Sequence, residues 1–378
     1  RWFTRDDAYY YFKVAQNISE GHGSTFDGIN KTNGYHPLWM LICVPIFALA
    51  RFDLVLPLRI LLLVMSALQI STAILLYRLL GKIFAPAVGA IAALFWVFSF
   101  DVLVNIYQQG LESGIAAFFV ALLLYKLHEF EINRRANTTT TKQLALLGLI
   151  GALTIFSRLD LVFFVALCGI WVIFRDHPLR YFLPLDITAA AASIFIAFLL
   201  RLTLPDYYNY STVAVTMAAL ALVIKIPLAF FFGLCDKHTL ANFRTWTLRL
   251  FLSTAAGSAL VGILMLAVPS ASGFPRSVIL LDFGFTLLFF GLPRLAYSLI
   301  RARNETSDDK VNPLSELKQK WQTWTKDGFA YFSVAFGLLG VYMIWNKLTI
   351  GSFSPVSGQI KRWWGSFPAR VYGGATRS

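Results

Sequence analysis

The chain has 378 residues, of which 57% are hydrophobic and 14% are charged, and its mean hydropathy is +0.63. Soluble domains average about 45–50% apolar and 25% charged residues, so this composition excludes an ordinary soluble protein and predicts an integral membrane protein. The formal net charge of +13 does not indicate nucleic-acid binding, because the basic residues lie in short loops between apolar runs, where anionic lipid headgroups retain them.

Residues 1–56 are expected to form a polar first loop with juxtamembrane helices. Asp6 and Asp7 are adjacent carboxylates ahead of the aromatic run YYYF, in a helix that Gly21 or Gly23 would end. Two interpretations stay open. The pair could stabilise the first turn of that helix, or it could supply a general base beside a partner or metal ligand. The neighbouring aromatic residues predict a belt at the membrane interface.

The segment NGYHPLW follows this helix and leads into an apolar run at 38–50. Asn33, Tyr35 and His36 are candidate binding residues here, and His36 either contacts a phosphate or caps a turn. The apolar run has 13 residues and contains Pro45, so it predicts a juxtamembrane or re-entrant helix in place of a full span.

Long apolar runs predict about ten membrane-spanning helices in residues 57–346, because a hydrocarbon core of about 30 Å needs about 20 apolar helical residues. The expected spans are 57–77, 83–103, 112–127, 143–157, 159–174, 181–200, 211–233, 248–268, 277–299 and 328–346. With this count, basic residues concentrate in the loops on one side, including the charged, partly helical loop 301–327. The positive-inside tendency then places residues 1–56 and the tail 347–378 on the outer, non-cytoplasmic face.

Three further polar clusters fall on that outer face. Glu112 lies in QQGLES at the entrance of a span, Arg158 and Asp160 lie in SRLD between two short spans, and Lys361 and Arg362 precede two tryptophans. Each cluster has a structural alternative: a first-turn charge for Glu112, a simple ion pair for Arg158 with Asp160, and membrane anchoring for the two cations. Charged residues are expected to be few in the membrane interior.

The three cysteines, Cys43, Cys168 and Cys235, lie within or beside apolar runs. They are expected to be core residues without a redox or metal role.

The motifs DDAYYYFKVAQNISEGHG, NGYHPLW, GLES and SRLD occur in this order and resemble the bacterial GT-C glycosyltransferases. The resemblance is strongest to the group that contains the terminal arabinofuranosyltransferases of mycobacterial cell walls, and it covers about the first 175 residues. It implies an all-α, GT-C-like multi-helix bundle in the bacterial plasma (inner) membrane and a polyprenyl-phosphate sugar donor. Separately, the start inside a polar loop without an initiator Met and the tail without a terminal helix predict that an anchor helix before residue 1 and part of the C-terminal region are missing from this sequence.

The resemblance further implies that Asp6 and Asp7 are catalytic, one of them as the general base of an inverting sugar transfer to a glycan, lipid or protein acceptor. Donor binding is expected from Glu112, Arg158 and Asp160, with His36, Tyr35, Asn33, Lys361 and Arg362 as further candidates. A divalent cation, Mg or Mn, at Asp6, Asp7 and Glu112 is compatible with these ligands. Two alternatives stay open: a membrane transporter or lipid flippase, which should carry ionisable residues near the middle of its spans, and a noncatalytic membrane scaffold.

Overall fold

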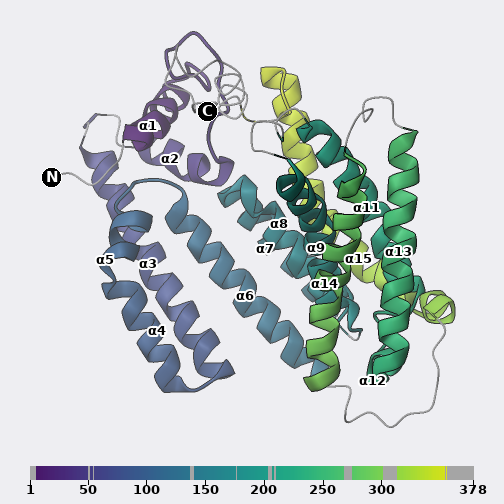
Figure 1. Cartoon of the computed structure of the whole chain (residues 1–378). Coiled ribbons are helices and arrows are strands. Elements are labelled where there is room, and N and C mark those ends of the chain that lie inside the picture. Colours follow the sequence, from purple (N-terminus) through teal and green to yellow (C-terminus); the bar gives the residue numbers. More distant parts are fainter. Residues whose placement is uncertain are drawn as a thin grey trace. The chain divides into compact units, whose positions relative to one another are not determined.

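The structure is a computed structural model that describes residues 6–49, 52–53, 55–136, 140–175, 177–202, 207, 210–267, 275–300, 313–353 and 355 (Figure 1). The described part of the chain is helical apart from turns and one isolated bridge between Thr25 and Lys31. It divides into two compact units, one within residues 1–169 and from 327 onward, the other within residues 170–326.

The first unit begins with two helices that pack on each other, α1 (Asp6–Ser19) and α2 (Pro37–Leu49). Gly21 follows α1 with a φ of 86°, and the hydrogen bonds Gly21 N to Ile18 O and His22 N to Asn17 O close the helix in a Schellman motif. Of the two glycines predicted to end this helix, Gly21 therefore does so. Proline at the first position of α2 suits a helix start, because its missing N–H is not needed there.

The loop between α1 and α2 is held by side-chain hydrogen bonds to its own backbone. Asn17 donates to the carbonyls of Thr25 and Phe26, and Ser24 donates to the carbonyl of Thr32. The Tyr35 hydroxyl lies 2.7 Å from the Ser24 hydroxyl. These bonds fix the segment that leads into His36.

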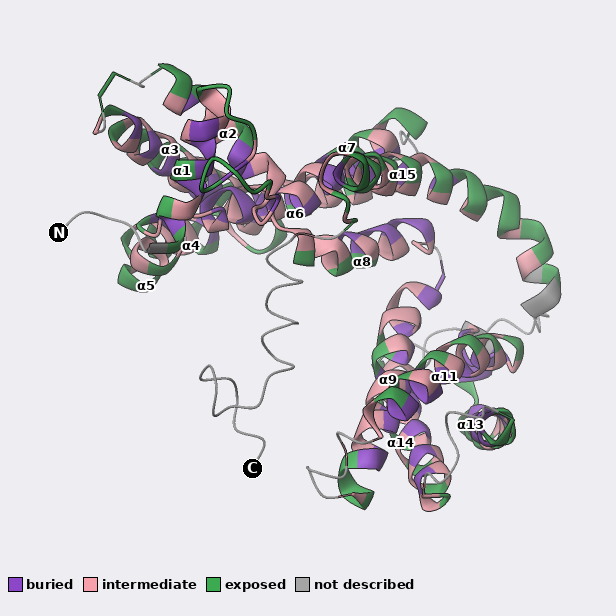
Figure 2. Cartoon of the chain, turned by 90° about the horizontal axis from the view of Figure 1, so that it is seen from above, coloured by how far each residue is buried: buried purple, intermediate pink, exposed green. Residues whose placement is uncertain are grey.

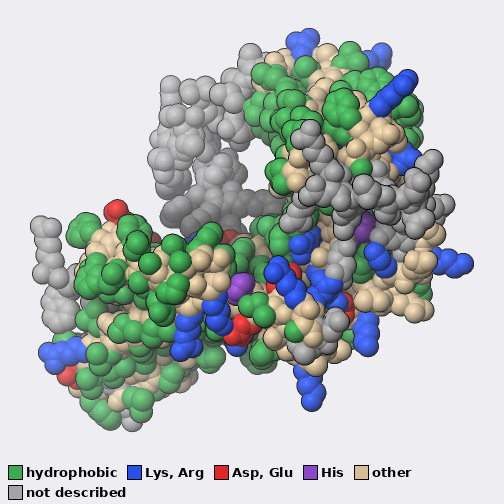
Figure 3. Space-filling model, turned by 90° about the horizontal axis from the view of Figure 1, so that it is seen from below, with side chains coloured by type: hydrophobic (Ala, Val, Ile, Leu, Met, Phe, Trp, Pro, Cys, Tyr) green, Lys and Arg blue, Asp and Glu red, His purple; other side chains and the backbone are tan. Residues whose placement is uncertain are grey.

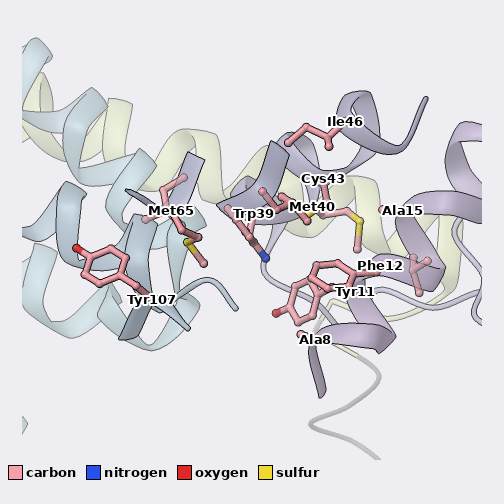
Figure 4. Packing of buried hydrophobic residues seen from close by; sticks show 13 residues of the cluster. Ala8, Tyr11, Phe12, Ala15, Trp39, Met40, Cys43, Ile46, Met65 and Tyr107 are labelled. Carbon is pink, nitrogen blue, oxygen red and sulfur yellow. The ribbon is translucent and has the colours of Figure 1, made fainter. Parts of the chain in front are cut away.

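Figure 4 shows the hydrophobic cluster on which this region is built. Tyr11, Phe12 and Trp39 are at most 7% exposed and pack with Met65 and Tyr107 from later helices. The interfacial-belt interpretation is therefore wrong for these three side chains, although Tyr9 remains exposed. Burial of the rings attaches the polar first loop to the helices that follow.

The first unit continues with α3 (Leu56–Ile83), α4 (Pro86–Phe98), α5 (Phe100–Val102), the π-helical turn η1 (Leu103–Tyr107) and α6 (Ser113–Arg135). In Figure 1, α3 lies beside both α4 and α6, and both pairs are in contact. The chain bends by 53° between α4 and the α5–η1 segment. It continues with α7 (Thr141–Ser157), the 3₁₀ turn η2 (Leu159–Leu161), α8 (Val162–Ile173) and the second half of α15 (Pro313–Ile350).

The second unit is a bundle of α9 (Leu179–Arg201), α11 (Ser211–Phe231), α13 (Phe243–Leu266) and α14 (Ser277–Ile300), with the short α12 (Lys237–Ala241). α9 packs on α11 and α14, and α13 packs on α11 and α14. The buried faces of α9, α11 and α13 carry small residues such as Ala190, Ala221 and Gly257, which let helices approach closely in a membrane.

Six described helices are long and apolar enough to cross a membrane, or seven if the bent pair α4 and α5–η1 counts as one span. They are Leu56–Ile83, Leu179–Arg201, Ser211–Phe231, Phe243–Leu266, Ser277–Ile300 and Leu317–Ile350. Large apolar side chains such as Ile91, Val223 and Leu280 face outward, and Figures 2 and 3 show exposed positions and surface hydrophobic side chains in both units. The chain is an all-α integral membrane protein, while the count of ten spans stays a prediction.

Candidate functional site

Four separate segments of the first unit bring one group of polar side chains together, which we call the polar cluster: Tyr11, His36, Glu112, Arg158 and Asp160. Tyr11 comes from the buried face of α1, and His36 stands directly before α2. Glu112 precedes α6, and Arg158 and Asp160 lie at the break between α7 and η2. Four of the five were predicted as site residues from the sequence, and Tyr11 was not.

His36 connects three of these segments. Its backbone N–H donates to the Tyr11 hydroxyl at 3.1 Å, and its Nδ1 accepts the backbone N–H of Leu159 at 3.2 Å. Because an accepting Nδ1 carries no proton, the neutral ring places its proton on Nε2. Nε2 lies 3.5 Å from Glu112 Oε1, so the imidazole directs a donor toward that carboxylate. His36 therefore fulfils the turn-capping alternative and also lies in the polar cluster.

Glu112 reaches the polar cluster because the chain turns sharply before α6. Gly110 adopts a φ of 70°, which favours glycine, and its carbonyl accepts the Trp39 indole N–H at 3.2 Å. Glu112 then occupies the N-cap position of α6, and it is 8% exposed. The helix dipole favours a carboxylate at this position. The first-turn interpretation of Glu112 is compatible with the structure, but the carboxylate also contacts His36.

Arg158 and Asp160 form a two-point ion pair in the turn that follows α7. Arg158 Nε lies 3.2 Å and Nη2 3.0 Å from the two carboxylate oxygens of Asp160. Arg158 is extended, with φ −151° and ψ 120°, so α7 ends there and η2 begins. The side chains of Arg158 and Asp160 are 39% and 62% exposed, which leaves the guanidinium accessible to an anion from solvent.

The members of the polar cluster influence one another electrostatically. Burial lowers the pKa of His36 below its usual value; the Arg158 cation lowers it further, while Glu112 and Asp160 oppose the change. Burial and the nearby Glu112 carboxylate raise the pKa of the Tyr11 hydroxyl. Near neutral pH the polar cluster thus offers a neutral imidazole and a protonated phenol beside a guanidinium.

The other predicted site residues either lie outside the polar cluster or fall outside the described residues. Asp7 is exposed in the first turn of α1, one turn before Tyr11, while the side chain of Asp6 lies outside the described residues. Asn33 is buried in the loop between α1 and α2, and Tyr35 packs near Tyr11 with ring centroids 6.5 Å apart. Lys361 and Arg362 also lie outside the described residues.

A metal site is not visible among the described side chains: they contain no group of three or more His, Cys, Asp or Glu residues that could hold an ion. Because the Asp6 side chain is not described, the cation suggested for Asp6, Asp7 and Glu112 stays a prediction. The three cysteines are buried, as their apolar surroundings predicted, and they are unbridged.

The second unit contains ionic groups that the sequence analysis missed. Lys225 of α11 lies 2.6 Å from both carboxylate oxygens of Asp282 of α14, and the two side chains are at most 1% exposed. Arg294 of α14 donates to both carboxylate oxygens of Asp186 of α9 at 2.8 and 2.7 Å. The expectation of few interior charges is therefore wrong for this unit. A sequence signal existed, because Asp282 and Arg294 both stand inside the apolar run of α14, where a charged side chain is costly unless it is paired.

No family model, curated protein or solved structure matches this chain.

Proposed function

We propose that the protein is a GT-C-type glycosyltransferase that moves a sugar from a polyprenyl phosphate to an envelope glycan, lipid or protein acceptor. The proposal rests on the motif resemblance, and one structural observation supports it. Residues from three of the resembling motifs, His36, Glu112 and Arg158, share one polar cluster although they are far apart in sequence. In this proposal the protein has about ten spans in a bacterial plasma membrane, and the polar cluster faces the non-cytoplasmic side.

The chemistry would proceed in one displacement. The carboxylate of Asp7 or Asp6 takes the proton from an acceptor hydroxyl, whose oxygen attacks the anomeric carbon. The bond between that carbon and the phosphate oxygen breaks, and the lipid phosphate leaves with the bonding electron pair. Inversion follows from this single displacement, and phosphate needs little acid assistance because it is a good leaving group.

Arg158 suits the leaving phosphate for a physical reason. Its guanidinium presents parallel N–H donors that match two phosphate oxygens, and it already holds the two oxygens of Asp160 in this way. A phosphate would replace Asp160, which is exposed enough to be solvated when released. His36 Nε2–H and Glu112 would position the sugar hydroxyls.

Turnover with a panel of polyprenyl-phosphate sugars tests this proposal. Asp7→Asn and Asp6→Asn should show which carboxylate is the base by a loss of about 100-fold or more in kcat. Asp101→Asn, an exposed first-turn aspartate of α5, is the matched control. Unchanged turnover in both loop variants would remove the base role, and inactivity of the folded wild type with every donor would refute the donor class.

Arg158→Gln provides the second test, with exposed Arg59→Gln as its control. Loss of phosphate stabilisation should lower kcat more than it raises KM, because the charge on the phosphate grows toward the transition state. Equal turnover in the Arg158 and Arg59 variants would contradict the assigned role of Arg158.

A transporter or flippase remains the second candidate, and the ion pairs of the second unit favour it. Ionisable groups inside spans mark ion or substrate pathways in many membrane proteins. Flux into liposomes that contain the purified protein tests this candidate. A flux that Lys225→Met with Asp282→Leu abolishes, in a protein that remains folded, would support transport over transfer.

A further inference from the structure

A groove in the first unit has no part in the proposed transfer reaction. It has a volume of about 770 Å³ and lies between the α1–α2 loop, α2 and the last turns of α15. Its apolar wall includes Met40, Val44 and Trp345, and its polar side includes Lys31, Tyr35 and Asn346. The five residues of the polar cluster are not among its described lining residues, although Tyr35 and Pro37 on either side of His36 are, so the groove is distinct from the polar cluster but adjoins it.

One wall of the groove carries a buried amide whose hydrogen bonding within the protein is incomplete. Asn346 is 3% exposed, and its Nδ2 has no hydrogen-bond partner among the described residues. The Tyr342 hydroxyl, one turn earlier on α15, interacts with the Asn346 side chain, but the two do not reach standard hydrogen-bond geometry among the described residues. A buried amide donor without an acceptor is destabilising, so a ligand oxygen that accepts from it would be stabilising. The groove has room for a ligand that does so.

The chemistry of the lining defines that ligand. A long apolar wall suits a hydrocarbon chain, the exposed Lys31 suits an anion at the rim, and the Asn346 amide suits an ester or phosphate oxygen. Trp345 lies on the exposed face at the end of a membrane-spanning helix, where tryptophan is typical of the headgroup level. These features together match an anionic amphiphile that enters from the bilayer.

We propose that the groove binds an anionic bilayer phospholipid, whose phosphate meets Lys31 and whose oxygens accept from Asn346. The bound lipid joins the end of α15 to the loop that carries Tyr35 and leads into His36. This site is additional to the donor site of the proposed transferase. A polyprenyl phosphate shares the phosphate and the apolar chain, so the experiment must separate the two lipids.

Native mass spectrometry of the detergent-purified full chain, titrated with phosphatidylglycerol or phosphatidylcholine, tests the proposal. Phosphatidylglycerol should bind at a lower lipid concentration than phosphatidylcholine. Lys31→Ala should weaken its binding about fivefold, since one basic residue near a surface contributes roughly that factor. Lys13→Ala, an exposed lysine of α1 outside the groove lining, should leave binding unchanged. Equal binding of the two lipids, or equal losses in both lysine variants, would overturn the proposal.

Asn346→Leu separates ligand binding from a purely structural role. Without lipid, this variant should unfold at an equal or higher temperature than the wild type, because it removes an unpaired buried donor. With phosphatidylglycerol, it should lose most of the thermal stabilisation that lipid gives the wild type. A lower unfolding temperature without lipid together with an unchanged lipid effect would refute the binding role.

Competition distinguishes this inference from the proposed function. Polyprenyl phosphate should not displace phosphatidylglycerol from the groove at concentrations that support turnover. Full displacement would make the groove part of the donor site and overturn a separate phospholipid site, while the transferase proposal would stand. Absent turnover with intact phospholipid binding would refute the transferase and leave the groove assignment in place.

Discussion

The buried network around Asp282 should be a stability-sensitive polar feature of the second unit. Its carboxylate accepts from Lys225 and also from Ser193 and Ser258 at 2.8 Å, so it joins α9, α11, α13 and α14. Thr286, which accepts from Lys225, completes the network. Removing one ionic partner leaves the other charged and buried, and this costs about 3–5 kcal/mol.

These contacts determine how much each variant should lower the free energy of unfolding. Asp282→Leu and Lys225→Met should each destabilise the protein by about 3–5 kcal/mol, whereas the double variant leaves no unpaired charge and should cost less than either single variant. Ser258→Ala removes one neutral interhelical hydrogen bond, which contributes only about 0.6 kcal/mol on average in a membrane. Since each single variant should cost about 3–5 kcal/mol and the double variant less than either, the coupling energy between Lys225 and Asp282 should exceed about 3 kcal/mol.

Equilibrium unfolding in mixed micelles measures all four corners of this double-mutant cycle. A matched control is the pair Lys126 and Glu129 on α6, which has a 2.8 Å contact but side chains that are 37% and 31% exposed. Its coupling should stay within about 0.5 kcal/mol, because water screens exposed pairs. A Lys225–Asp282 coupling no larger than that of the control would refute the reasoning from burial.

Three further predictions concern the first unit. Burial lowers the pKa of His36 in the folded protein, so the stability that the neutral ring contributes is present above about pH 6.5 and is lost as the pH falls. His36→Asn keeps a hydrogen-bond acceptor but does not titrate, so its unfolding temperature should depend less on pH between about pH 7 and pH 5 than that of the wild type. Gly148→Ala should destabilise by about 1–3 kcal/mol in denaturant titrations, because its Cβ would overlap a backbone carbonyl of α15, whereas Gly284→Ala meets no atom within 4 Å and should be neutral or stabilising. Asp160→Asn should tighten binding of inorganic phosphate to Arg158 in calorimetric titrations, since it removes a competing anion; weaker binding would show that Asp160 positions the guanidinium.

Local chemistry made parts of this fold predictable. The α-helical membrane class follows from composition, the end of α1 follows from Gly21, and the short α2 follows from an apolar run that cannot cross a bilayer. The span predicted for 211–233 lies close to α11, whose apolar length is unambiguous. Helix ends were less predictable: α15 extends from Pro313 to Ile350, so its charged first turns continue into the span expected at 328–346.

Pairings between distant segments could not be predicted, because they depend on how helices pack. The contact between His36 and Leu159 joins residues 123 positions apart, and Lys225 and Asp282 are 57 positions apart. No local pattern encodes such distances. The family resemblance selected Glu112 and Arg158, but only the fold shows that the His36 ring lies beside Glu112 and that Tyr11 joins them.

The Lys225–Asp282 network and the Arg158–Asp160 pair differ in whether an incoming ligand could replace one of the charged partners. Asp282 is fully buried, and both of its carboxylate oxygens accept hydrogen bonds. If a ligand replaced Asp282 as the partner of Lys225, the carboxylate would remain buried with neither a cation nor water to stabilise it. Arg158 and Asp160 are exposed, and an exposed pair contributes only about 0–1 kcal/mol, so an incoming phosphate can replace Asp160 at little cost. Glu112 and His36, more buried beside them, keep the geometry while this exchange occurs. Ligand chemistry is therefore better placed at the polar cluster, whereas the Lys225–Asp282 network is better suited to holding four helices in register.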